Sequence, residues 1–155
     1  MYPGLNFARL ILVCIVFLCL AQGTSSAKQI AVIVNNGNSV QNISAVEIAK
    51  IFKCNTRTWT SGIQITVVVR DPSTPEMELL LSRIYKISPD ELKSFIAAHK
   101  DAVVVVDSNA AMLNAVHTIP GAIGLIDVFS INQQVKVVKI DGKLPVEYGY
   151  ILRGN

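Results

Sequence analysis

The stretch "VVVRDPSTPE", Val67 to Glu76, joins the end of a predicted strand to the beginning of a predicted helix. Its valines favour a buried β-strand, and Arg70 follows them directly. Ser73 and Thr74 precede a proline, a residue favoured at the first helical position, and the glutamates after it suit the positive end of a helix dipole. A strand that passes into a helix over so few residues is typical of an α/β protein.

The same alternation of strands and helices continues along the chain. Apolar runs bounded by turn residues predict strands at 29–35, 63–70, 102–107, 121–128 and 134–140. Apolar residues at helical spacing, preceded by capping residues, predict helices from 44 to 52, 75 to 85, 89 to 99 and 108 to 116. Runs such as "VVVV" lack polar alternation, which predicts strands covered on both faces. The expected fold is therefore a three-layer α/β fold with a mainly parallel or mixed central sheet, helices on both faces, and room for one antiparallel strand near the end.

Residues 1–27 are expected to direct export. Arg9 supplies a positive charge, "LILVCIVFLCLA" (Leu10 to Ala21) is an apolar run, and "SSA" (Ser25 to Ala27) offers small residues for cleavage. A transmembrane helix needs about 20 apolar residues, so a cleaved signal peptide is favoured over a retained N-terminal anchor. Residues 28–155 then form a single domain that is periplasmic or secreted, or membrane-anchored if the segment is retained.

The charge of the chain is too balanced to indicate a nucleic-acid partner. The 155 residues carry 14 Lys and Arg against 11 Asp and Glu, a net charge of +3 at pH 7, and the basic residues are scattered along the sequence. Nucleic-acid-binding domains instead gather basic residues on one face. The sequence therefore predicts no nucleic-acid partner.

The side chains that perform most chemistry are sparse. Cys54 is the single cysteine after residue 27, so we expect it to be packed and not paired within the domain. The two histidines, His99 and His117, stand without a cysteine or carboxylate at ligand spacing, and no metal or other cofactor is predicted. Asp107 and Asp127 lie near predicted strand ends, where a turn or cap role is favoured over paired acid-base chemistry. No nucleophile elbow or nucleotide-binding glycine loop is present, so we expect no enzyme.

The ordered set of segments is more specific than any one of them. "ISAVEIAKIF", "GIQITVVVRD" and "HTIPGAIGLIDV" occur in this order, after "IAVIVN" and before "VKVVKIDG". Together they resemble the phosphate-binding proteins of bacterial ABC transporters, which have a periplasmic-binding-protein-like fold of type 2. The resemblance covers Gln29 to about Leu144, and "PGAIG" (Pro120 to Gly124), with "IF" and Trp59, is its strongest part. It implies a short member with one of the family's two lobes, phosphate or a similar oxyanion as ligand, and a membrane transporter as partner.

The sequence also departs from the family pattern. Cys54 stands where the family has a glycine after "IF", and Leu125 stands where an aromatic residue is common. The turn "RDPSTPE" lacks the glycine of the family's Ser/Gly/Thr-rich turn and adds Pro72 and Pro75. Losing that glycine puts in doubt the close approach of backbone N–H groups to an anion.

The candidate ligand site lies where strands end and helices begin, because free backbone N–H groups and the positive end of a helix dipole meet there. Arg70 offers a bidentate fork to a tetrahedral oxyanion, and Ser73 and Thr74 offer hydroxyl donors. Ser108 and Asn109, after the next strand, bring a second helix start to the same edge of the sheet.

The competing interpretation is structural. Ser73 or Thr74 can be an ordinary helix cap, with Arg70 paired to Asp71 or Glu76. The chain is then an interaction module of the cell envelope that has lost its ligand. If the site does bind an anion, a homodimer could rebuild the missing half of the cleft.

Three other features have simpler interpretations. Trp59 is expected to pack beside the helix that ends at Phe52, with a surface anchor for a partner as the alternative. Gly121 and Gly124 are expected to allow tight passage of the chain into a strand. The lysines at 136, 139 and 143 are expected on the solvent face of the last strand, with an edge that recruits another chain as the alternative.

Overall fold

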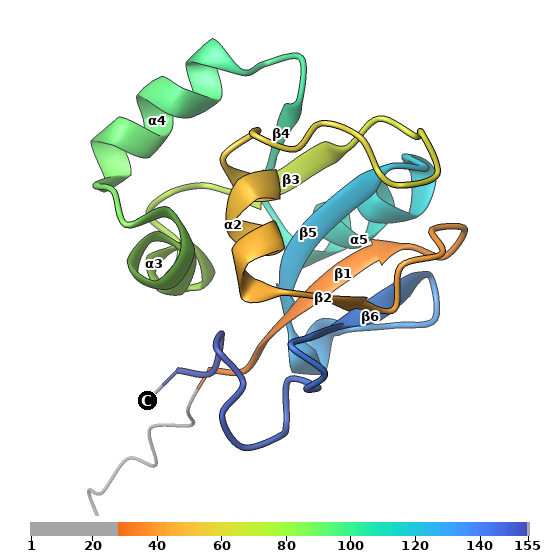
Figure 1. Cartoon of the computed structure of the whole chain (residues 1–155). Coiled ribbons are helices and arrows are strands. Elements are labelled where there is room, and N and C mark those ends of the chain that lie inside the picture. The colour runs from red at the N-terminus through yellow and green to blue at the C-terminus, as the bar shows by residue number, and fades with distance from the viewer. Residues whose placement is uncertain (1–27, 155) are drawn as a thin grey trace, which may run out of the picture.

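The computed structural model describes residues 28–154, and the predicted targeting segment 1–27 lies outside them. The described chain forms one six-stranded sheet with helices on both faces (Figure 1). In chain order the strands are β1 (Ile30–Asn35), β2 (Asn42–Ile43), β3 (Thr66–Arg70), β4 (Val103–Val106), β5 (Ala122–Asp127) and β6 (Val135–Ile140). Across the sheet their order is β2-β6-β1-β5-β3-β4.

The sheet is mixed, and the strand that runs against the others is the first. β1 pairs antiparallel with both β5 and β6, whereas β3 pairs parallel with β4 and β5, and β2 pairs parallel with β6. The mixed α/β sheet expected from the sequence is confirmed, but placing its antiparallel strand near the end of the chain was wrong. An apolar run reports that a strand is buried and carries no information about its direction.

The helices begin where the capping signals place them. They are α2 (Ala45–Phe52), α3 (Pro75–Leu80), the π-helical turn η1 (Leu81–Tyr85), α4 (Pro89–Ala98), α5 (Asn109–Thr118) and the 3-10 turn η2 (Val128–Ser130). The predicted helix over 75–85 is continuous with its π-helical end, which stops at Lys86, a residue with a φ of 54°. Ser44 and Ser88 form complete capping boxes with the glutamates three residues later. The two-residue strand β2 was not predicted, because it is too short to show a pattern.

The core lies on both faces of the sheet, and β1 divides its side chains between them. Ile30, Val32 and Val34 join the cluster formed with α2, η1 and α4, whereas Ala31 and Ile33 join the cluster formed with α5. Figure 1 shows α2, α3 and α4 on one side of the sheet and α5 on the other. The three-layer architecture is therefore confirmed.

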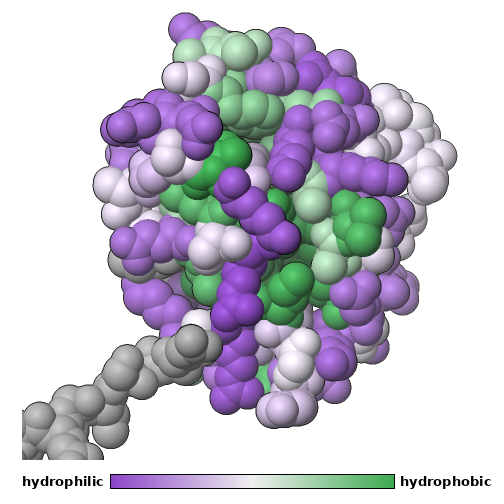
Figure 2. All heavy atoms as spheres, turned by 60° about the vertical axis from the view of Figure 1, so that its left-hand side comes forward, coloured by the Kyte–Doolittle hydropathy of each residue, from purple (hydrophilic) through white to green (hydrophobic). Residues whose placement is uncertain are grey.

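The surface on the side of α3 and α4 is mostly polar, with small apolar areas between the polar side chains (Figure 2). Within residues 28–154, no helix combines the length and the apolar character needed to span a bilayer.

The run "VVVV" is not covered on both faces as expected. β4 is an edge strand that pairs only with β3, and Val105 is 48% exposed. Four valines in a row favour a strand wherever it lies in the sheet, so their pattern does not distinguish an edge from a central position.

The lysines of β6 were expected on its solvent face, with an edge that recruits another chain as the alternative. β6 lies between β1 and β2, so it is not an edge that another chain could extend. Lys136 is half-buried and its ammonium group donates to the backbone carbonyl of Asn38, while Lys139 is exposed. Only part of the predicted lysine face is therefore directed to solvent.

We expect Ser44→Ala to lower the free energy of unfolding by about 1 kcal/mol, because the Ser44 hydroxyl caps α2 by accepting from Glu47 N–H at 3.1 Å. The hydrogen bonds from Ser44 lower the pKa of Glu47 below its ordinary value of 4.5. The wild-type advantage is therefore present above that value and is lost as the pH falls through the lowered pKa of the folded state. Urea unfolding at pH 7 and pH 3 measures both effects. Ser61→Ala, at an exposed position in the 60–65 loop, is the control; an equal loss there would contradict the capping role.

Candidate functional site

The predicted site residues lie along the edge of the sheet where β3, β4 and β5 end, which we call the Arg70 edge. Arg70 is the last residue of β3 and pairs in register with Val106, the last residue of β4. Because the two strands are parallel, the residues after Val106 come to the same edge as Arg70. The sequence therefore predicted correctly that Arg70 and Asn109 would lie together.

Arg70 is held by oxygen atoms of the segment that follows β4. One terminal nitrogen donates to Asn109 Oδ1 at 2.6 Å, and the other donates to the Asp107 carbonyl at 2.9 Å. Asn109 in turn donates through Nδ2 to Ser130 Oγ at 2.7 Å, in the turn after β5. A network of side chains thus joins the ends of three neighbouring strands. Ser130 was missed by the sequence analysis, and its position after the predicted strand 121–128 is the signal that could have indicated it.

The positive charge of Arg70 has neutral partners in this network. The ion pair with Asp71, one of the two offered by the competing interpretation, is not formed. The side chain of Glu76, the other possible partner, lies outside the described part of the structure. Arg70 Nε is buried, and it has no hydrogen-bond partner among the side chains that the structure describes. A buried donor without a partner is uncommon in folded proteins, and a guanidinium has five N–H groups to satisfy. The arginine therefore retains donors and charge beyond those its neighbours use.

Ser73 and Thr74 face Asp71 instead of the network around Asn109. The amide and the hydroxyl of Ser73 both donate to Asp71 Oδ1, at 2.9 and 2.5 Å. These bonds lower the pKa of Asp71. Thr74 occupies the cap position of α3, but its hydroxyl donates to the Asp71 carbonyl at 2.9 Å and does not cap the helix. A carboxylate of the chain itself thus accepts the Ser73 donors that an oxyanion would need.

The other candidates at this edge act as helix caps. Ser108 Oγ accepts from Ala111 N–H at 3.1 Å at the start of α5, which leaves its hydroxyl hydrogen available. Asp127 accepts from Phe129 N–H at 2.8 Å, so the cap role favoured by the sequence is confirmed for this residue. Asp107 is exposed and contributes its backbone carbonyl to Arg70. No group of three His, Cys, Asp or Glu side chains within residues 28–154 is arranged to hold a metal ion.

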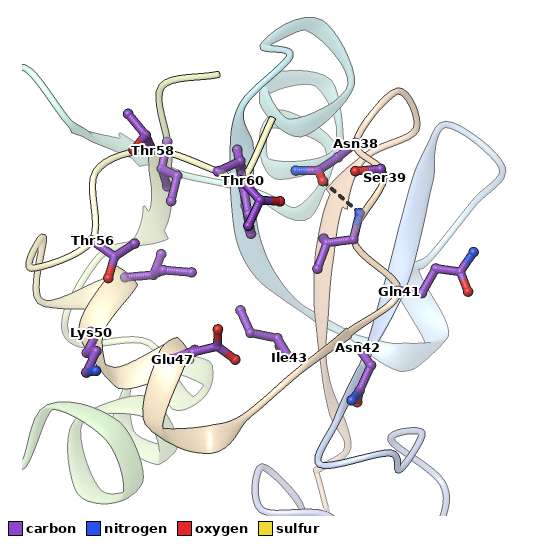
Figure 3. Close-up of a pocket in the computed structure, with 14 residues that line it drawn as sticks. Asn38, Ser39, Gln41, Asn42, Ile43, Glu47, Lys50, Thr56, Thr58 and Thr60 are labelled. Atoms are coloured by element: carbon purple, nitrogen blue, oxygen red, sulfur yellow. Dashed lines mark hydrogen bonds between the residues drawn. The ribbon is translucent and has the colours of Figure 1, made fainter. Parts of the chain in front are cut away.

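A pocket of about 410 Å³, which we call the Asn38 pocket, opens at the opposite edge of the sheet (Figure 3). Its walls come from residues 38–43, 47–51 of α2, and 56–65. These segments follow the end of β1 and precede the start of β3. Since β1 runs antiparallel to its neighbour β5, they lie at the edge away from Arg70. The sequence did not predict this pocket.

Trp59 lines the Asn38 pocket and is also packed against the core. Its indole N–H donates to the Gly121 carbonyl at 3.0 Å, which ties the 56–65 segment to the start of β5. The expected packing role of Trp59 is confirmed, as is the tight chain passage at Gly121, where an added Cβ would lie 1.8 Å from the Gln64 carbonyl oxygen.

Cys54 and the histidines lie where the sequence indicated. Cys54 is half-buried and packs against the core, and burial raises the pKa of its thiol. The backbone φ of Cys54 is 55°, in the left-handed region that favours glycine. Glycine is the residue expected at this position from the family resemblance stated above. His99 ends α4, and His117 lies in the last turn of α5.

No family model matches the sequence, and no curated protein matches it. Solved structures do match the fold. An ABC-type phosphate transport receptor from Vibrio cholerae superposes with a TM-score of 0.69 at 22% identity, over 83% of this chain and 55% of the receptor. A putative phosphate ABC transporter substrate-binding protein with bound phosphate, from Clostridium perfringens, gives 0.66 at 21% identity over 77% of this chain and 47% of that protein. PstS from Borrelia burgdorferi superposes with a TM-score of 0.67 at 18% identity, over 83% of this chain and 55% of that protein.

This chain spans about half the length of these structures. Their low sequence identity makes the likeness one of fold. The resemblance stated from the sequence is confirmed at that level: residues 28–154 have the α/β fold of about half of a phosphate transporter substrate-binding protein.

Proposed function

We propose that this chain binds a small tetrahedral oxyanion, phosphate first, at the Arg70 edge, and that it is a binding protein and not an enzyme. The observation that carries the proposal is the state of Arg70. Its terminal nitrogens are held by two neutral oxygens, from Asn109 and Asp107, and no described carboxylate forms an ion pair with it. An oriented guanidinium with spare donors suits the bidentate recognition of an oxyanion.

The residues around Arg70 have complementary parts in this proposal. Asn109 and the Asp107 carbonyl hold the guanidinium plane, and the Ser108 hydroxyl, which already accepts from Ala111 N–H, donates to the anion from the start of α5. Ser73 and Thr74 join after their hydroxyls turn away from Asp71. The anion then competes with the Asp71 carboxylate for the Ser73 donors, so binding is weaker than at a site without that carboxylate.

The solved structures that this chain resembles, which are a transport receptor and a substrate-binding protein, support a wider setting for the proposal. We propose an exported location, with residues 1–27 as signal peptide or anchor, and a membrane transporter as the partner. Because this chain spans about half the length of those proteins, a second copy facing the Arg70 edge would cover the bound anion.

The test is isothermal titration of the protein, expressed from the full chain and purified after export, with phosphate, sulfate and chloride. Saturable binding of phosphate is expected. Arg70→Ala should weaken it at least about tenfold, because a hydrogen bond to a charged group contributes about 1.5–3 kcal/mol. Asp71→Asn should strengthen it, because the competing negative charge is removed.

Arg83→Ala is the control, since it removes one exposed arginine from the far end of the α3–η1 helix and should leave binding unchanged. Flat traces for every anion, or an equal loss in Arg70→Ala and Arg83→Ala, would contradict the proposal. The bonds from Ser73 to Asp71 would then favour the second candidate function, an interaction module of the cell envelope whose anion site is closed by its own carboxylate.

A further inference from the structure

The Asn38 pocket contains an unusual polar group. Asn38 is 7% exposed, and among the side chains that the structure describes it is the one polar or charged residue that is buried. Its backbone N–H donates to the Asn35 carbonyl at 2.9 Å, its carbonyl accepts from Lys136, and its Oδ1 accepts from Val40 N–H at 2.9 Å. These bonds fix both the backbone and the amide plane of Asn38.

The amide nitrogen of Asn38 is left free by this arrangement. Nδ2 makes no hydrogen bond to the described residues, and it points into the pocket towards Thr60 (Figure 3). Nδ2 is not among the fully buried unpaired atoms of the described residues, so it is open to the pocket. A donor held in this way can donate to a ligand oxygen or to water in the pocket.

The opposite wall presents hydroxyl groups at regular spacing. Thr56, Thr58 and Thr60 are two residues apart, and all three line the pocket. None of their hydroxyls is bonded to another described residue. Figure 3 shows Thr56 and Thr58 across the pocket from Asn38 and Ser39, with Thr60 between them.

The other residues that line the Asn38 pocket include several apolar side chains, and their charges cancel. Ile43, Ile51 and Ile65 line the pocket together with Trp59, and its two charged residues, Glu47 and Lys50, have opposite signs. The pocket therefore offers hydroxyl and amide groups on facing walls, apolar side chains between them, and no excess charge. Small-ligand sites combine an apolar lining with a few placed polar groups in this way, and about 410 Å³ is within their usual range of volumes.

We infer that the Asn38 pocket binds a neutral, polyhydroxylated ligand of one or two sugar rings. The hydroxyl edge of a sugar ring matches the Asn38 and threonine groups, while its C–H faces match the isoleucines and the indole. The balanced charge disfavours an anion here, in contrast to the Arg70 edge. This inference is independent of the proposed oxyanion site, because the two sites lie at opposite edges of the sheet.

The chain carries its own reporter for this site, since Trp59 is the single tryptophan in all 155 residues. Tryptophan fluorescence of the purified protein is titrated with D-glucose and maltose, and with gluconate and inorganic phosphate as charged counterparts. We expect a saturable change with at least one neutral sugar, with a dissociation constant on the order of 1 mM for a site of a few hydrogen bonds. Phosphate bound at the Arg70 edge should leave the fluorescence unchanged, so the two sites can succeed or fail separately.

Two variants test the polar groups. Asn38→Asp keeps the oxygen that accepts from Val40 N–H and replaces the free donor by an acceptor, and Thr58→Val removes one hydroxyl at almost constant shape. Each is expected to weaken sugar binding about three- to tenfold. Asn114→Asp and Thr118→Val make the same chemical changes on α5, away from the pocket, and should leave binding unchanged. Circular dichroism of each variant establishes that it is folded.

Amide chemical shifts provide a second measurement that does not depend on the response of the indole. Sugar-induced shifts confined to residues 38–43 and 56–65 would support the inference. It would be overturned by the absence of both fluorescence and shift changes for every sugar, by preferential binding of gluconate or phosphate at this pocket, or by equal losses in the pocket and α5 variants.

Discussion

Replacing Gly121 by alanine is expected to lower the free energy of unfolding by about 3 kcal/mol, at the upper part of the usual range for overpacking. A Cβ at this position would lie 1.8 Å from the Gln64 carbonyl oxygen and 2.9 Å from its carbonyl carbon. The obstacle is backbone, so no rotation of a side chain relieves it. The Gly121 carbonyl also accepts from Thr66 N–H and from the Trp59 indole, so any shift of the chain disturbs both bonds.

Urea unfolding of the wild type and Gly121→Ala measures this loss. Gly62→Ala is the control in the neighbouring loop, because a Cβ there meets no atom within 4 Å although the φ of 83° disfavours it. We expect a loss of about 1 kcal/mol for the control, from backbone conformation alone. Equal losses at the two glycines would show that close chain contact at Gly121 is not the cause.

Phe52→Ala is expected to destabilise the domain by about 3–5 kcal/mol, the range for removing a buried phenylalanine. Phe52 is 0% exposed and ends α2. Its ring forms a T-shaped pair with the ring of Tyr85, at a centroid distance of 6.2 Å and an interplanar angle of 89°, so the substitution also removes an aromatic pair. The cavity would lie between α2 and the π-helical turn.

Thermal and urea unfolding of Phe52→Ala, compared with Phe129→Ala, measure the contribution of burial. Phe129 is 82% exposed, so its loss should change the free energy of unfolding by no more than about 0.5 kcal/mol. A loss below about 1 kcal/mol in Phe52→Ala would mean that the neighbouring side chains collapse into the space.

Much of the fold could be predicted because its signals are local. Ser44 and Ser88 begin their helices through bonds to residues three positions later, which the sequence displays directly. Strand direction and strand order are not local, so neither the antiparallel β1 nor the exposure of Val105 on an edge strand could be derived from periodicity.

Some features of the candidate site could likewise be predicted from the sequence, and others could not. The proximity of Arg70 and Asn109 follows from two parallel strands that end together, and the sequence predicted it. The engagement of Ser73 with Asp71 depends on the rotamers of one turn, which composition does not reveal. The Asn38 pocket is built from three separate segments of the chain. One of them contains β2, which is placed by pairing with β6, where Asn42 lies opposite Lys139, 97 residues further along the chain.

The two ends of the described chain are bound to each other. Gly154 N–H donates to the Lys28 carbonyl at 2.7 Å, and Gln29 forms a bridge with Arg153. A short linker could therefore close residues 28–154 into a ring, with new ends in the exposed 60–63 loop, without moving any strand. For the same reason, if residues 28–154 were inserted into a surface loop of another protein, the two junctions would lie side by side.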